Sequence, residues 1–92
     1  MYLYDYSDTL KKILQKLLKK DKKLFEQILK KIEEIINNYN VDNYKNLRNN
    51  LKEYKRVHIG HFVLVFKFIK SENKIIFENF DHHDNIYDKK FV

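Results

Sequence analysis

Four histidines are the side chains of this sequence best suited to chemistry, and they fall in two places along the chain. His58 and His61 flank a glycine, whereas His82 and His83 are adjacent and come later. Near neutral pH an imidazole can either accept or donate a proton, because its unperturbed pKa is about 6.5. If the protein catalyses a reaction, we expect proton transfer by these side chains.

The two earlier histidines lie in residues 54–68, YKRVHIGHFVLVFKF, a stretch that predicts a β-hairpin bent around Gly60, the single glycine of the chain. A two-residue turn at this point pairs Ile59 with Phe62, Val57 with Leu64 and His58 with Val63. One face of the hairpin is then apolar and predicts a core made of Val57, Ile59, Phe62, Leu64 and Phe66. The opposite face predicts a mildly basic platform that carries Arg56, His58, Val63, Val65 and Lys67.

The two later histidines follow a third predicted strand, residues 74–80, and belong to the run DHHDNIY at 81–87. In an antiparallel sheet this run can return to the hairpin, so we predict that it approaches His58. Asp81 and Asp84 flank the histidine pair and could join it in binding a metal. Adjacent histidines on a strand point to opposite sides, however, and no distant third ligand stands out. We therefore expect neither a metal nor another cofactor.

The segments before the hairpin predict a short strand and two helices. Residues 2–6 alternate as a strand does, and Ser7 or Asp8 can cap a first helix, as Asp21 can cap a second. Apolar residues recur with helical spacing, first at Leu10, Ile13, Leu14, Leu17 and Leu18, and then at Leu24, Phe25, Ile28, Leu29, Ile32, Ile35 and Ile36. These stripes are too wide for a coiled-coil seam, so we expect an antiparallel helix pair packed on a sheet.

The segment 37–53 is rich in residues that favour turns. Its apolar residues are spaced for one short helix or an extended tether laid on the core, namely Tyr44, Leu47 and Leu51. Three cations would project from it: Lys45, Arg48 and Lys52. Together the segments predict an α+β fold in a single domain, residues 1–92, with an N-terminal strand, an antiparallel two-helix hairpin and a small antiparallel sheet.

Composition limits the classes of function. The 92 residues include 19 Lys and Arg against 13 Asp and Glu, a formal charge of +6 that favours a polyanionic partner such as RNA, DNA or an acidic protein. The absence of cysteine excludes disulfides, thiolate metal sites and cysteine nucleophiles. No apolar run approaches the roughly 20 residues that span a bilayer, and the first residues do not resemble a signal peptide. We therefore expect a cytoplasmic protein that does not enter a membrane.

The order strand, helix, helix, hairpin and strand resembles the RelE/ParE superfamily of toxin–antitoxin toxins. The resemblance covers residues 4–87 and is carried mainly by residues 44–47, 54–59, 62–67 and 83–87. It is most similar to the histidine-using YafQ-type branch, which has a histidine where His58 stands, an aromatic at Phe62, and a histidine four residues before an aromatic, as His83 precedes Tyr87. The sequence departs from the superfamily at Val63 and near Asn79, where arginines are expected.

The resemblance implies a ribosome-dependent mRNA endonuclease, held inactive by a cognate RelB-like antitoxin in a toxin–antitoxin hetero-oligomer. It assigns the base and acid roles to His58 and His83, in either order, with Arg56 stabilising the transition state. Tyr87 completes the implied catalytic set and could stack on a base, as could Phe62. The residues expected to contact RNA are His61, Phe62, Lys67, Lys45, Arg48, Lys52 and His82.

Two other interpretations remain open. A ParE-like toxin would inhibit a partner such as DNA gyrase by binding alone. The missing arginines at Val63 and near Asn79 favour that interpretation, or a catalytically decayed relative. A small basic nucleic-acid-binding domain unrelated to toxins would also explain the charge, but the sequence has no recognisable recognition helix or stacking motif.

Overall fold

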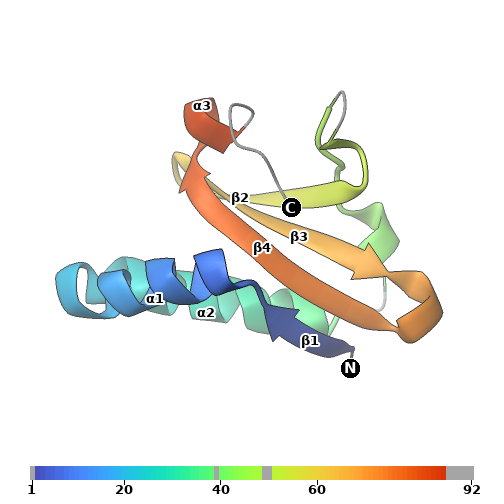
Figure 1. The fold of residues 1–92 in the computed structure, drawn as a ribbon, viewed down its shortest axis with the longest axis horizontal. Helices are drawn as coiled ribbons and strands as arrows, with labels where there is room; N and C mark the ends of the chain where they lie inside the picture. The colour runs from blue at the N-terminus through green and yellow to red at the C-terminus, as the bar shows by residue number, and fades with distance from the viewer. Residues whose placement is uncertain (1, 39, 49–50, 87–92) are drawn as a thin grey trace.

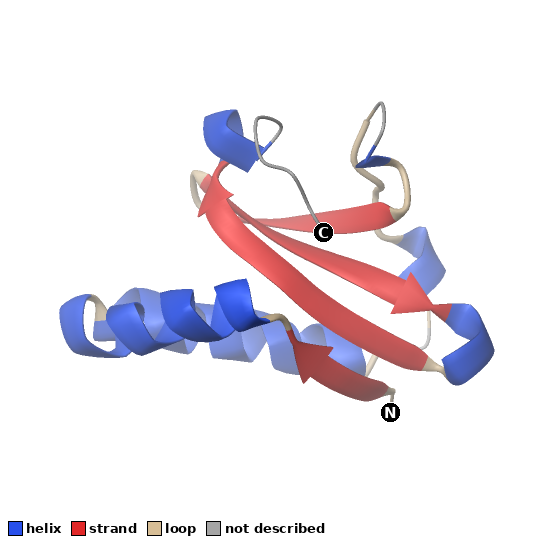
Figure 2. Ribbon diagram, in the orientation of Figure 1, coloured by secondary structure: helices blue, strands red, loops and turns tan. Residues whose placement is uncertain are grey.

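A layer of two helices packs on one face of a four-stranded sheet (Figure 1, Figure 2). The computed structural model describes residues 2–38, 40–48 and 51–86. The strands are β1 (Leu3–Tyr6), β2 (Tyr54–Ile59), β3 (Phe62–Ile69) and β4 (Lys74–His82). The helices are α1 (Asp8–Lys20), α2 (Lys22–Ile36) and the short α3 (His83–Ile86), with 3-10 turns at η1 (Val41–Asn43) and η3 (Lys70–Glu72). This arrangement confirms the predicted α+β fold.

The sheet has the strand order β1-β4-β3-β2. β2, β3 and β4 pair antiparallel, but β1 joins β4 as a parallel strand, with Leu3 opposite Lys74 and Tyr6 opposite Phe77. The predicted antiparallel sheet is thus confirmed for β2, β3 and β4, and the parallel pairing of β1 at its edge is an addition that the sequence analysis did not predict. The local pattern could not reveal this, because alternating side chains look the same in a parallel and an antiparallel strand.

Both predicted helix caps are present. The Ser7 hydroxyl accepts a hydrogen bond from the Leu10 N–H at 3.0 Å and also donates to the Glu78 carbonyl, which ties the start of α1 to β4. The Asp21 carboxylate accepts from the Leu24 N–H at 3.1 Å at the start of α2. Each cap satisfies a backbone donor that the first helical turn leaves without a partner.

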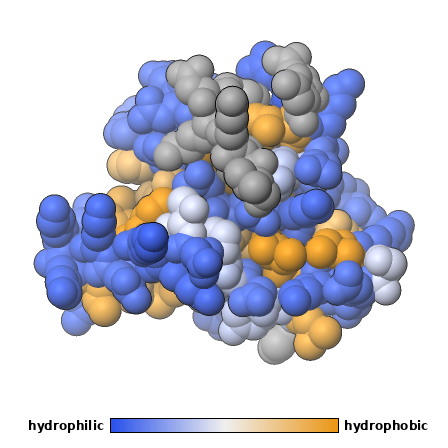
Figure 3. Space-filling view, viewed as in Figure 1, coloured by the Kyte–Doolittle hydropathy of each residue, from blue (hydrophilic) through white to orange (hydrophobic). Residues whose placement is uncertain are grey.

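The helix layer and the apolar face of the sheet form the main core. Its most buried members include Leu10 of α1, Ile28 and Ile35 of α2, and Phe66 and Phe77 of the sheet, all fully buried. The rest of the visible helix surface is mainly hydrophilic (Figure 3). Two residues of the predicted stripes, Leu18 and Leu29, stay largely exposed because they lie at the outer border of the helix pair.

The hairpin has the register that the sequence predicts. Ile59 lies opposite Phe62, and His58 lies opposite Val63. Gly60 has φ +62°, a left-handed conformation that residues with a side chain rarely adopt, so the bend favours glycine at this position. The turn therefore fixes His58 on the face of β2 that points away from the helices.

That second face is not the basic platform that the sequence suggested. Val63 and Val65 are fully buried there, in a separate apolar cluster completed by Leu47, Leu51, Tyr54 and Ile86. The segment before β2 supplies Leu47 and Leu51, and α3 supplies Ile86. The expectation is wrong because two distant segments fold over this face, and the alternation of a single strand does not record such contacts.

The segment before β2 is an extended tether rather than a helix from residue 44 to residue 47. Leu47 N–H donates to the Tyr54 carbonyl at 2.8 Å, and Arg56 N–H donates to the Lys45 carbonyl at 2.9 Å, so this segment covers the free edge of the sheet. Lys55 is buried and its ammonium donates to the Asp42 carbonyl, the Tyr44 carbonyl and the Asn46 side chain, at 2.9–3.2 Å. Lys55 thus holds the tether against β2 through three hydrogen bonds.

Candidate active site

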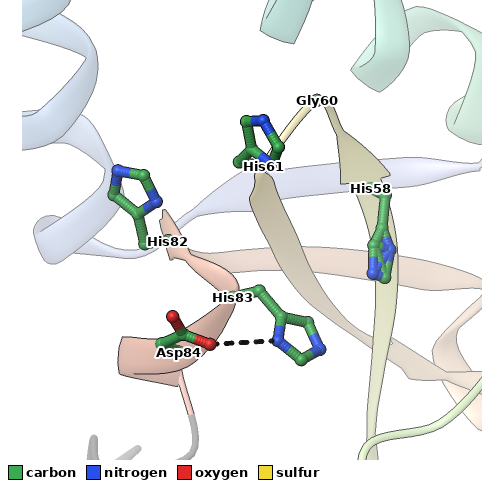
Figure 4. Close-up of a pocket in the computed structure, with 6 residues that line it drawn as sticks. All are labelled: His58, Gly60, His61, His82, His83 and Asp84. Carbon is green, nitrogen blue, oxygen red and sulfur yellow. Dashed lines mark ion pairs between the residues drawn. The ribbon is translucent and has the colours of Figure 1, made fainter.

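All four histidines of the chain line one hollow at the bend of the hairpin (Figure 4). The hollow has a volume of about 530 Å³ and is bordered by His58, Gly60, His61, His82, His83 and Asp84. β4 runs to His82, two residues beyond the predicted end, and α3 then begins at His83. The His83 N–H donates to the His61 carbonyl at 3.1 Å, which holds the start of α3 against the hairpin turn.

His58 and His83 lie side by side in this hollow. Their ring centroids are 5.6 Å apart and the ring planes differ by 21°, so the two imidazoles are nearly parallel (Figure 4). Both side chains are exposed to solvent. The predicted approach of the later histidines to His58 is therefore confirmed for His83.

Each of these two histidines has a charged neighbour. A guanidinium nitrogen of Arg56, Nη1, lies 3.4 Å from His58 Nε2, and a carboxylate oxygen of Asp84 lies 3.7 Å from His83 Nδ1. Arg56 is half-buried, and its Nε has no hydrogen-bond partner among the described residues. The pair of imidazoles is thus flanked by a cation at one end and a carboxylate at the other.

His82 and His61 take different positions from the stacked pair. The His82 ring packs on Phe62 with centroids 4.4 Å apart, and Phe62 stacks on Phe80 at 5.0 Å. His82 thus lies on the helix side of the sheet, whereas His83 lies on the other side, as expected for neighbours at the end of a strand. His61 is exposed in the turn. No group of three or more potential metal ligands occurs within residues 2–38, 40–48 and 51–86.

The remaining predicted site residues lie away from the stacked histidines. Lys67 pairs with Glu53 at 3.6 Å and lies over the Tyr54 ring, at the far end of the hairpin. Lys67 is four residues along β3 from Val63, the residue opposite His58. The backbone of Lys67 therefore lies roughly 14 Å from that of Val63 along the strand. The three tether cations are exposed and belong to the segment before β2: Lys45, Arg48 and Lys52. Tyr87 lies outside the described residues.

The positions where the resemblance led us to expect arginines, Val63 and one near Asn79, fall in a buried part of the sheet. Val63 belongs to the second apolar cluster, and Asn79 uses its side-chain oxygen to accept from the Phe80 N–H at 2.8 Å. Arg56, which lies opposite Val65, is the cation next to the stacked pair. Lys67 lies too far from the imidazole pair to supply this cation.

Sequence reasoning missed Asp84 as the carboxylate beside His83. The signal was present in the acidic residues on either side of the two histidines, which were weighed only as metal ligands. It also missed an ionisable group on β4, Glu78, which lies near Lys67 and Glu53. Burial raises the pKa of the Glu78 carboxyl, an effect that Lys67 opposes and Glu53 reinforces.

Comparisons with known proteins place this geometry in a known fold. The toxin of the RelBE2 toxin–antitoxin complex of Mycobacterium tuberculosis superposes with a TM-score of 0.72 at 16% identity, covering 89% of this chain and 91% of that chain. The isolated E. coli RelE toxin superposes with a TM-score of 0.69 at 20% identity, covering 89% and 84%. The fold is therefore that of RelE toxins.

Sequence comparison is more specific. Residues 4–87 match the family described as ParE toxin of type II toxin–antitoxin system, parDE. The putative toxin RelE4 of Methanocaldococcus jannaschii is 54% identical over 91 residues, covering 98% of this chain and 95% of the relative. The chain belongs to this toxin family. The predicted RelE/ParE superfamily is thus confirmed, whereas the YafQ-type branch stays a prediction.

None of the described helices is long and apolar enough to cross a membrane.

Proposed function

We propose that this toxin cleaves mRNA on the ribosome, in the cytoplasm, by metal-free acid–base catalysis between His58 and His83. The observation that carries the proposal is the stacked imidazole pair, with ring centroids 5.6 Å apart in an open hollow. Two imidazoles so close together can serve the attacking and the leaving oxygen of one phosphodiester. The charge of +6 further favours an RNA partner.

The proposed reaction is an internal transfer of the phosphoryl group. A base removes the proton of the ribose 2′-hydroxyl, and the 2′-oxygen attacks the phosphorus. The bond to the 5′-oxygen breaks as an acid gives that oxygen a proton. The products are a 2′,3′-cyclic phosphate and a free 5′-hydroxyl. A cation near the phosphorus stabilises the charge of the transition state, and Arg56 is the cation nearest to the pair.

We infer one order of the two roles from the charges that flank the imidazoles. Arginine carries only donors, so Arg56 Nη1 can hydrogen-bond His58 Nε2 only in the neutral tautomer that carries its proton on Nδ1. When Arg56 turns to the phosphate, this nitrogen is free to accept the 2′-hydroxyl proton, as a general base does. The ion pair of His83 with Asp84 exists only when His83 is protonated, which is the form of a general acid. We therefore assign His58 as the base and His83 as the acid, with Asp84 as a positioning residue.

A second part of the proposal concerns the partner. The solved RelBE2 relative is a toxin–antitoxin complex, and we propose that a RelB-like antitoxin likewise holds this chain in a hetero-oligomer. A mainly apolar hollow of about 310 Å³ lies where α1 and α2 meet, with Phe25, Leu18 and Leu29 among its lining residues. An amphipathic segment with acidic flanks would bury this surface and oppose the surrounding lysines.

One observation favours a second candidate function. The matching family is that of ParE toxins, and the arginines that the resemblance leads us to expect are missing at Val63 and near Asn79. A ParE-like toxin that inhibits DNA gyrase by binding would need no catalytic pair. A decayed relative would retain the fold and the antitoxin without the reaction.

The test is primer-extension mapping of mRNA in a cell-free translation reaction. The wild type should cut within translated codons. His58→Ala and His83→Ala should each lower the cleavage rate by about 10²- to 10⁴-fold, the usual contribution of a general acid or base. His61→Ala is the comparison variant, because it removes an exposed imidazole from the same hollow, an expected RNA contact that is not part of the stacked pair, and it should lower the rate by clearly less. Circular dichroism checks the fold of every variant.

Intact mRNA with the folded wild type would overturn the ribonuclease and move the gyrase-binding toxin to first place. A gyrase supercoiling assay on the same preparation would then separate that toxin from a decayed relative. Equal losses in His58→Ala and His61→Ala would also contradict the assignment, because a role for the stacked pair requires the two variants to differ.

A further inference from the structure

A second hollow adjoins the histidine hollow across the hairpin bend. Its volume is about 380 Å³, and it shares His58 and Gly60 with the first. Its opposite wall is one side of α2 and carries Gln27, Lys30, Lys31 and Glu34. The two hollows therefore meet at the bend, and together they line a path from the imidazole pair to α2, which we call the groove.

The bend leaves this groove open. Gly60 has no side chain, and a Cβ built there would meet no atom within 4 Å. Besides Gly60, the described hairpin residues that line the second hollow are His58 and Ile59. A strand that enters the histidine hollow can thus continue toward α2 without crossing a protruding side chain at the bend.

The α2 wall offers one cation for a ligand. Lys31 is engaged by Glu34, its ion-pair partner at 3.3 Å. Lys30 is exposed and forms no ion pair with any residue in the described part of the chain. Gln27 lies one helical turn before it and adds an amide that can donate or accept.

We propose that Lys30 binds the RNA backbone next to the cleaved phosphodiester and that the mRNA strand runs along this groove. The inference rests on the proposed ribonuclease function and adds a binding residue to it. A groove whose wall on α2 carries charged and amide side chains, with a free ammonium and next to the imidazole pair, suits a phosphate better than an apolar protein segment. Lys30 is a positioning residue, because it lies beyond the histidine hollow.

The test compares Lys30→Gln with Lys23→Gln in single-turnover cleavage on ribosomes programmed with a defined mRNA. Lys23 is the matched control, an exposed lysine on α2 outside the groove. Lys30→Gln should raise the half-saturating toxin concentration by roughly 3- to 10-fold and leave the saturating rate within about twofold of wild type. It should also reduce the slope of log affinity against log salt by about 0.7, the value for one phosphate contact on a single strand.

A neutral methylphosphonate introduced at one linkage at a time around the cleaved bond identifies the phosphate. At one linkage this change should weaken mRNA binding by the wild type and by Lys23→Gln but leave mRNA binding by Lys30→Gln unaffected. A double-mutant cycle requires this result for a direct contact. If the losses of affinity caused by Lys30→Gln and by the methylphosphonate were additive at every linkage, the inference would be overturned. Lys30 would then contact ribosomal RNA or a protein instead of the mRNA. Equal behaviour of the two lysine variants would also overturn the inference.

The failures are distinguishable. If the wild type does not cleave mRNA at all, the proposed function falls and the inference falls with it. If the wild type cleaves and Lys30→Gln matches Lys23→Gln, the inference alone is wrong. If Lys30→Gln weakens antitoxin binding without any change in cleavage, the groove is a protein interface and the inference is likewise overturned.

Discussion

The two faces of the sheet are built differently. The helix-covered face has a continuous core in which residues of α1, α2, β3 and β4 are fully buried. The other face has a small cluster made by the tether, the hairpin and α3, and the imidazole pair lies beside it. The large core stabilises the domain, whereas the small cluster holds the segments that position the site. Stability and activity are therefore expected to respond to different residues.

The largest effect on stability is expected from Phe66→Ala on the helix-covered face. Phe66 is fully buried and touches both Tyr44 and Phe77. Loss of such a ring leaves a cavity and typically costs about 3–5 kcal/mol, a large part of the stability of a small domain. Urea unfolding followed by circular dichroism measures it. Phe68→Ala, a half-buried aromatic on the same strand, should cost clearly less. Equal losses would contradict the assignment of the core.

The same substitution on both faces sharpens the comparison. Ile28 and Ile86 are both fully buried, the first in α2 against the main core and the second in α3 against the second apolar cluster. Ile28→Ala should lower the free energy of unfolding by about 2–5 kcal/mol and leave the cleavage rate of the folded protein unchanged. Ile86→Ala should cost less global stability, because α3 can open locally, yet lower cleavage about tenfold or more through His83.

Both isoleucine variants are measured by urea unfolding and by single-turnover cleavage at a temperature where each is folded. If Ile28→Ala reduced cleavage more than Ile86→Ala did, the helix-covered face would not act mainly in stability and the other face would not act mainly in positioning the site.

The tether depends on a buried lysine. Lys55→Met keeps the apolar stem but removes three hydrogen bonds, so that the acceptors in Asp42, Tyr44 and Asn46 lose their partner. The expected cost is about 2 kcal/mol, with faster hydrogen exchange of the Leu47 and Arg56 amides that pair with the tether and β2. Lys12→Met, at an exposed lysine of α1, is the control and should change neither quantity. An unchanged exchange pattern in Lys55→Met would contradict the role.

The smallest effect is expected at Glu78 on β4. Because burial raises the pKa of Glu78, the folded state binds its proton more tightly than the unfolded state does. This contribution to stability is fully present below the unfolded pKa and is lost as the pH rises through the folded pKa. Glu78→Gln should therefore raise Tm at neutral pH, by less than the roughly 4 °C that 1 kcal/mol gives in a domain of this size. At acid pH the two proteins should melt alike.

Much of the helix-covered face could be predicted from local pattern. Helical periodicity and the caps at Ser7 and Asp21 define α1 and α2, and Gly60 with its alternating neighbours fixes the register of the hairpin. The proximity of His83 to His58 followed from the order of the strands. These features depend on neighbours within a few residues or on a single turn.

The rest depends on contacts between distant segments. The sequence pattern presents Val63 and Val65 as an exposed alternation, and only the tether and α3 bury them. Lys55 looks like an ordinary surface lysine until the tether encloses it. The parallel direction of β1 leaves no local trace either. The role of Asp84 emerges only when α3 places it beside His83.

The most direct test of the central claim is the pH dependence of single-turnover mRNA cleavage. A reaction that requires a neutral His58 and a protonated His83 has a rate that rises, passes through a maximum and falls as the pH increases. The account predicts this bell shape for the wild type, loss of the rising limb in His58→Ala and loss of the falling limb in His83→Ala. A bell shape that persists in both variants would contradict it, because the proton transfers would then belong to other groups.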